Sequence, residues 1–106
     1  MRLYRVTYRG TIAAITSAQL QAYYDGLVAM GLSAVGQPVV RTGTNGLLAG
    51  AWFNDAIFTM GMWNGNLFIE AILWRDTIDH GALENLTRNT FPVTSFHGYE
   101  DDMGTF

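Results

Sequence analysis

The sequence predicts an α+β fold, a two-layer sandwich in which two helices cover one face of a mostly antiparallel sheet. The first observation is a set of three apolar runs, separated by short turn signals, which predicts a three-strand meander over residues 47–74. The second is a pair of segments with apolar residues at helical spacing, one on each side of the meander. Together with alternating patterns near both ends, these give the order strand, helix, meander, helix, strand.

Length and composition limit the possible functions. The chain has 106 residues, so we expect a single domain over 1–106. Apolar residues make up 49% and charged residues 14%, which argues against disorder. There is no Cys and no Lys, which excludes disulfides, thiolate chemistry, Cys-ligated metals and lysine nucleophiles. The net charge of −3 has the wrong sign for a nucleic-acid-binding protein, so no nucleic-acid partner is expected.

Residues 2–9 have the period-2 pattern of a half-buried strand. Two sets of side chains are expected on opposite faces: Tyr4, Val6 and Tyr8 on one, and Arg5, Thr7 and Arg9 on the other. The tyrosines and arginines therefore cannot form one surface that stacks bases and contacts phosphates.

The first helix is predicted over residues 17–31, with Ser17 as its N-cap and Gly31 in a left-handed conformation at its end. Gly26 inside it lowers helix propensity, and we expect it to allow close packing against the sheet. Residues 32–46 read as a connector containing a short edge strand, Val39–Arg41.

The meander has two turn signals, Asn54-Asp55 and Asn64-Gly65. If both are two-residue loops, counting outward fixes the register. It pairs Phe53 with Ala56, Ala51 with Phe58 and Ala49 with Met60. It also pairs Met62 with Leu67, Met60 with Ile69, and Phe58 with Ala71.

This register gives the meander two faces. One is wholly apolar and is assigned to the core: Leu47, Ala49, Ala51, Phe53, Phe58, Met60, Met62, Leu67, Ile69, Ala71 and Leu73. The other would be polar if it met only water, yet it is also rich in apolar side chains: Leu48, Gly50, Trp52, Ile57, Thr59, Gly61, Trp63, Phe68, Glu70, Ile72 and Trp74.

A second helix is predicted from about residue 79 to 90, capped by Asp79 and unable to continue past Pro92. Residues 91–97 suit a final strand, and the acidic tail, about residues 98–106, is expected to be loose. Two strand–helix units around a hairpin also suggest a ferredoxin-like arrangement with an extra strand.

The second apolar face is the strongest candidate for a functional surface, because monomers rarely expose such a patch. The predicted interface comprises Trp52, Ile57, Thr59, Trp63, Phe68, Glu70, Ile72 and Trp74, with Arg5 and Arg9 at its margin. It would bind a second copy of the chain, another protein or a flat apolar ligand. The competing interpretation is that the connector, the tail or a bend in the sheet covers it within the monomer.

Glu70 is the one candidate catalytic residue. The register places it opposite Thr59 and among apolar side chains, where desolvation would raise the pKa of its carboxyl group, as a general acid or base needs. Two alternatives remain open: an ion pair with Arg5 or Arg9 across the sheet, or simple exposure at the rim of the patch.

Metal binding has weak support. Its candidate ligands are Asp76, Asp79, His80 and His97, but their spacing matches no metal signature. Acidic residues at a helix start are also explained by capping and by the helix dipole. No metal and no cofactor is therefore expected.

We consider three functional hypotheses. The first is a non-enzymatic binding or assembly domain that associates through the aromatic face as a homodimer, or as a component of a larger assembly such as a virus particle. The second is a small-molecule-binding protein or enzyme, with a pocket for a small apolar ligand on that face and Glu70 as polar anchor or base. The third is an inhibitor that docks on a host protein.

The expected location is the cytoplasm, or a particle assembled inside the cell. The N-terminal residues do not resemble a signal peptide. No apolar run approaches the ~18 residues of a membrane span, so no membrane association is expected.

Overall fold

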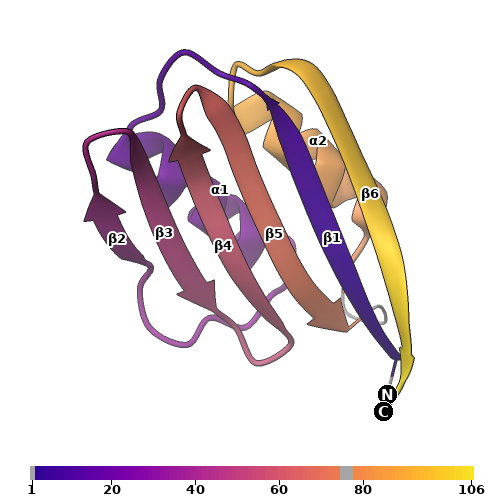
Figure 1. Ribbon diagram of the computed structural model, residues 1–106. Coiled ribbons are helices and arrows are strands. Elements are labelled where there is room, and N and C mark those ends of the chain that lie inside the picture. The colour runs from indigo at the N-terminus through magenta and orange to yellow at the C-terminus, as the bar shows by residue number, and fades with distance from the viewer. Residues whose placement is uncertain (1, 75–77) are drawn as a thin grey trace.

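The computed structural model describes residues 2–74 and 78–106 as a six-stranded antiparallel sheet with two helices on one face (Figure 1). The elements are β1 (Arg2–Thr11), α1 (Ser17–Ala29), β2 (Val39–Thr42), β3 (Gly46–Trp52), β4 (Ala56–Trp63), β5 (Asn66–Trp74), α2 (His80–Thr90) and β6 (Thr94–Thr105). The strand order is β2-β3-β4-β5-β1-β6. The predicted α+β sandwich and the short edge strand are therefore confirmed.

The register obtained by counting is also confirmed. Ala49 pairs with Met60 between β3 and β4, and Thr59 pairs with Glu70 between β4 and β5. The β4–β5 turn is formed by Asn64 and Gly65, whose φ angles of 49° and 77° are the positive values that a type I′ turn requires.

The first strand lies between β5 and β6 and is antiparallel to both. Tyr4, Val6 and Tyr8 are buried on the side of the helices, as the alternation predicts. Arg5 and Arg9 pair with Ile72 and Phe68 of β5, so they border the opposite face of the meander.

Without β2 and β3, the chain has the β-α-β-β-α-β element order of a ferredoxin-like arrangement. Two strands are added to this order at the β4 side of the sheet, whereas the sequence suggested one. The second addition is β2, whose four residues pair with β3.

The expectation of a loose tail is wrong. Strand β6 begins at Thr94, later than residue 91, and runs to Thr105. It pairs with β1 along most of that length, and Arg2 and Arg5 form ion pairs with Asp102 and Asp101. The acidic residues thus meet arginines of the neighbouring strand, a pairing that joins the two ends of the chain.

Two details of the first helix differ from the prediction. The N-cap is Thr16 rather than Ser17, because Thr16 and Gln19 form a reciprocal capping box. Gly26 packs against α2 rather than the sheet: a Cβ at this position would lie 2.5 Å from a methyl group of Leu86. The positive φ of Gly31 just past the helix end is as predicted.

The core lies between the helices and the sheet. Its large fully buried side chains include Tyr23 of α1 and Phe58 of β4, whose rings meet edge-on. The Tyr23 hydroxyl lies 2.9 Å from the Thr87 hydroxyl, and Thr87 in turn donates to the Leu83 carbonyl. These bonds satisfy the buried hydroxyls of both helices. Asp79 caps α2 as predicted, accepting from the backbone amides of Gly81 and Ala82.

Candidate functional site

The candidate site is the sheet surface that faces away from both helices, toward the viewer in Figure 1. We call it the aromatic face, and its large members are Trp52, Ile57, Trp63, Phe68, Ile72 and Trp74. Trp52, Ile57 and Trp63 are 44%, 47% and 49% exposed. Neither the connector nor β6 covers these three side chains, which removes the competing interpretation for this part of the face.

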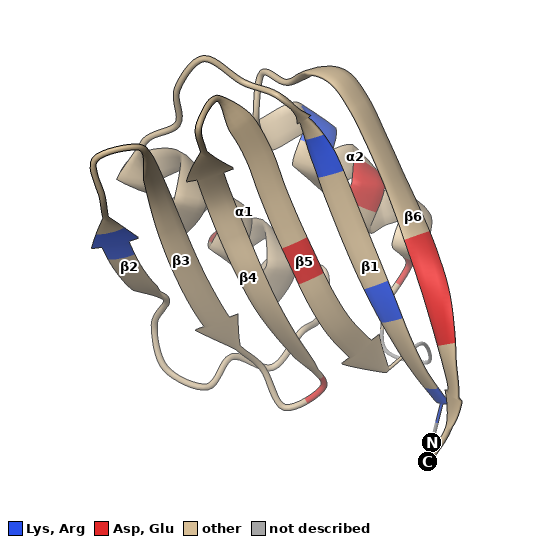
Figure 2. Ribbon diagram, in the orientation of Figure 1, with Lys and Arg blue, Asp and Glu red and all other residues tan. Residues whose placement is uncertain are grey.

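Charged residues are sparse on this side of the sheet. Figure 2 shows none on β3 or β4, and β5 carries Glu70 alone. Arginines stand at the two margins: Arg41 on the edge strand β2, and Arg5 and Arg9 on β1. Depletion of charge from the centre of an aromatic patch is typical of protein interfaces.

The arginines of β1 that border the patch are paired within the chain. Arg5 lies 3.0 Å from Asp101, and Arg9 lies 3.7 Å from the Glu70 carboxylate. The Arg9 guanidinium also stacks 4.2 Å above the centre of the Phe68 ring. Glu70 is thus partly exposed beside an arginine rather than enclosed. The ion pair that we considered for it is present, and this position does not favour the role of general base.

A shallow hollow of about 310 Å³ opens on the aromatic face, lined by Leu48, Trp63 and Phe68. Gly61 lies between Leu48 and Phe68 in the register and contributes no side chain. Glu70 does not line the hollow. Its lining is apolar, so it would hold an apolar group but supplies no acid or base.

The weak metal candidates do not converge. Asp79 caps α2, and His97 lies on the exposed strand β6 with its ring 6.0 Å from that of Tyr99. His80 faces Glu100, and Asp76 falls outside the described residues. Within residues 2–74 and 78–106, no three His, Asp or Glu side chains are grouped so that they could hold a metal ion.

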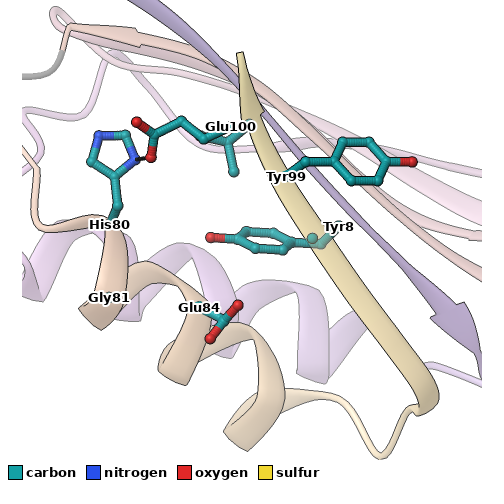
Figure 3. Close-up of a pocket in the computed structure, with 8 residues that line it drawn as sticks. Tyr8, His80, Gly81, Glu84, Tyr99 and Glu100 are labelled. Atoms are coloured by element: carbon teal, nitrogen blue, oxygen red, sulfur yellow. Dashed lines mark ion pairs between the residues drawn. The ribbon is translucent and has the colours of Figure 1, made fainter. Parts of the chain in front are cut away.

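A second hollow, of about 270 Å³, lies on the helix side of the sheet (Figure 3). Its titratable lining comes from three elements: Tyr8 of β1, His80 and Glu84 of α2, and Tyr99 and Glu100 of β6. Sequence analysis missed this group, although His80 and Glu84 have the i,i+4 spacing of one helix face. The missing information was the pairing of β1 with β6, which brings Tyr8 and Glu100 together.

No protein-family model matches the chain, and no curated protein matches it either. Among the described residues, no helix is both long and apolar enough to cross a membrane.

Proposed function

We propose that this protein is a non-enzymatic assembly domain that forms a homodimer through the aromatic face. The observation that supports this most is that Trp52, Ile57 and Trp63 are nearly half exposed on a sheet face that both helices leave open. Several large apolar side chains exposed on one face are rare on monomers and typical of interaction sites. Most soluble oligomers are symmetric assemblies of one chain, and a second copy offers the same apolar patch.

The size of the face suits a dimer. The open side of the whole sheet has six strands about 4.8 Å apart, with about eight residues each on average, which gives a plan area of roughly 800 Å². Protruding side chains increase the accessible area beyond this. A stable interface buries about 800 Å² on each partner, so face-to-face contact of two sheets would reach that size.

The charges favour a partner that is itself nearly neutral across this surface. Arg5 is paired with Asp101, and Arg9 with Glu70, so covering the face would not bury these charges without a partner. Burying an unpaired charge is costly, and intrachain pairing reduces that cost. A strongly charged partner would find little complementary charge at the centre of the patch.

The apolar hollow supports a second candidate function, the binding of a small apolar ligand. Leu48, Trp63 and Phe68 would contact such a ligand, and Arg9 lies beside Phe68 at its margin. In a dimer the same hollow would receive an aromatic or aliphatic side chain of the second copy. Interfaces commonly place an anchor residue in such a pocket.

The test is replacement of Ile57 by lysine. Wild-type protein is expected to have a mass near twice 11.7 kDa by light scattering at micromolar concentration. Ile57→Lys is expected to weaken association more than a hundredfold, because the dimer would bury two uncompensated ammonium groups. Ile57 is 47% exposed and lies outside the core, so the variant should remain folded.

The matched control is Val28→Lys, which adds the same charge at a 41% exposed apolar position on α1. This variant is expected to remain dimeric. A wild-type monomer at high micromolar concentration would contradict the proposal. Equal weakening by Ile57→Lys and Val28→Lys would contradict it too, because added charge alone would then explain the loss.

A further inference from the structure

One arginine at the margin of the aromatic face has no carboxylate partner. The structure describes five arginines, and four of them lie within 4.0 Å of an Asp or Glu oxygen. Arg41 of β2 is the exception among the described residues, and its Nη1 atom donates to the neighbouring Val40 carbonyl at 3.0 Å. A guanidinium has five N–H donors, so the edge formed by Nε and Nη2 remains able to hold a carboxylate bidentately.

The strand register places Arg41 beside the apolar hollow of the aromatic face. Arg41 is paired with Leu48 of β3, which lines the hollow. Paired residues of antiparallel strands point to the same side of the sheet, with Cβ atoms about 5 Å apart. An arginine side chain is long enough to cross one strand spacing of about 4.8 Å while its alkyl part covers apolar surface. The hollow therefore has a guanidinium within reach of its β3 side.

The opposite side of the hollow offers no unpaired charge. Phe68 of β5 lines this side, and the Arg9 guanidinium stacks 4.2 Å above the centre of its ring. Arg9 also lies 3.7 Å from the Glu70 carboxylate, which balances its charge. The charge of Arg41 has no such balance among the described residues. The hollow is therefore apolar in its centre and has one available positive charge, on the side of β2.

We propose that this hollow binds a small monocarboxylate with an apolar body, and that Arg41 pairs with the carboxylate. This inference rests on the small-ligand function proposed for the hollow, and it adds the charge of the ligand. The apolar body would lie on Leu48, Trp63 and Phe68, which line a volume of about 310 Å³, at the small end of ligand pockets. The carboxylate would lie toward the exposed edge of the sheet, where it stays partly in water and its desolvation costs little.

The charges of this region favour a ligand with one negative charge. A single guanidinium is available at the hollow, and the net charge of −3 disfavours a polyanion. A cation would find no carboxylate in the lining of the hollow. A second copy of the chain is the other possible occupant, but Glu70 and Asp101 on this side of the sheet already pair with arginines of their own chain. A free carboxylate therefore complements Arg41 better than the second copy does.

The test is a titration of the full chain with 4-phenylbutyrate at pH 7 and constant ionic strength, followed by the indole ¹H–¹⁵N signals. Trp63 lines the hollow, whereas Trp52 and Trp74 lie elsewhere on the aromatic face and serve as internal controls. The parent chain is Ile57→Lys, in which the proposed dimer does not cover the hollow. We expect a saturable shift of the Trp63 signal, with a dissociation constant of roughly 0.5–5 mM, as for other ligands of this size.

Arg41→Gln in the same parent chain tests the charge pair. This variant is expected to bind 4-phenylbutyrate about fivefold more weakly, as the loss of a partly exposed ion pair predicts. The matched alcohol, 4-phenylbutan-1-ol, should bind both chains with equal affinity, because it has no charge for Arg41 to pair with. The control Arg88→Gln removes the same charge from α2, on the other side of the sheet, and should leave the affinity for the acid within about twofold.

Three results would overturn the proposal. The first is an unchanged Trp63 signal up to about 20 mM acid, or equal shifts of all three indole signals. The second is an affinity for the acid that Arg41→Gln does not lower, which would keep the small-ligand function but remove the charge pair. The third is an equal loss for acid and alcohol in Arg41→Gln, which would reduce Arg41 to a packing role. Failure of the dimer is distinguishable, because light scattering of the wild-type chain tests it without ligand.

Discussion

Replacement of Phe58 by alanine is expected to lower the free energy of unfolding by about 3–5 kcal/mol. Phe58 is 1% exposed in the centre of β4, and its ring meets those of Tyr23 and Phe53 edge-on. Truncation removes these contacts and leaves a cavity between the sheet and α1. The paired antiparallel strands hold the sheet in position, so the surrounding structure cannot close this cavity. For a domain of this size the loss is a large part of the total stability.

The measurement is urea-induced unfolding at two protein concentrations, so that dissociation of a dimer is separated from unfolding of the chain. Val28→Ala serves as the control, because Val28 is exposed on α1 and alanine favours the helix. We expect this control to change the free energy by less than about 0.5 kcal/mol. A loss below 1 kcal/mol in Phe58→Ala would show that the ring is not part of a close-packed core.

Gly61→Ala is expected to cost at least about 3 kcal/mol, although only one methyl group is added. Gly61 has a φ of 154°, and a Cβ there would lie 2.1 Å from the Leu47 carbonyl oxygen and 2.8 Å from the Leu48 Cα atom. Both obstacles are backbone atoms of β3, so the collision can be relieved only by separating β3 from β4.

Gly36→Ala is the matched control for this prediction. Gly36 also has a positive φ, 78°, but a Cβ there would meet nothing within 4 Å. Its cost should be that of the left-handed backbone alone, about 1–2 kcal/mol. If the midpoint of urea unfolding falls equally in both variants, the close approach of β3 and β4 does not limit stability.

Local patterns in the sequence determined much of this fold. The Asn64-Gly65 turn fixed the β4–β5 register, and the period-2 alternation then assigned each side chain of the meander to a face. A slip of one residue in the register would have moved every side chain to the opposite face. Because the register was correct, both faces were assigned correctly. The Asp79 cap and the end of the first helix at Gly31 were equally local signals.

Features that depend on distant parts of the chain were not predictable. A strand was predicted over residues 91–97, but its continuation to Thr105 was not, because the acidic side chains of that part are satisfied by Arg2 and Arg5 on β1. Gly26 was predicted to pack against the sheet, because the sequence does not reveal that Leu86 of α2 packs on it. The predicted N-cap of the first helix was wrong because Thr16 and Ser17 are both good capping residues.

Of the two candidate sites, one depends on local patterns in the sequence and the other on distant parts of the chain. The aromatic face was accessible to sequence analysis because its members lie on three consecutive strands. The helix-side hollow was not, because Tyr8, His80 and Glu100 meet only once β1 has paired with β6 and α2 has packed beside them.

The most direct test of the proposed dimer uses the three tryptophans, which all lie on the aromatic face. Acrylamide quenching of their fluorescence should be measured above and below the concentration at which light scattering detects dissociation. Our proposal predicts that quenching falls at least about twofold in the dimer, because association buries the indole rings. A dimer whose tryptophans are quenched as strongly as those of the monomer would contradict it, since the chains would then associate through another surface.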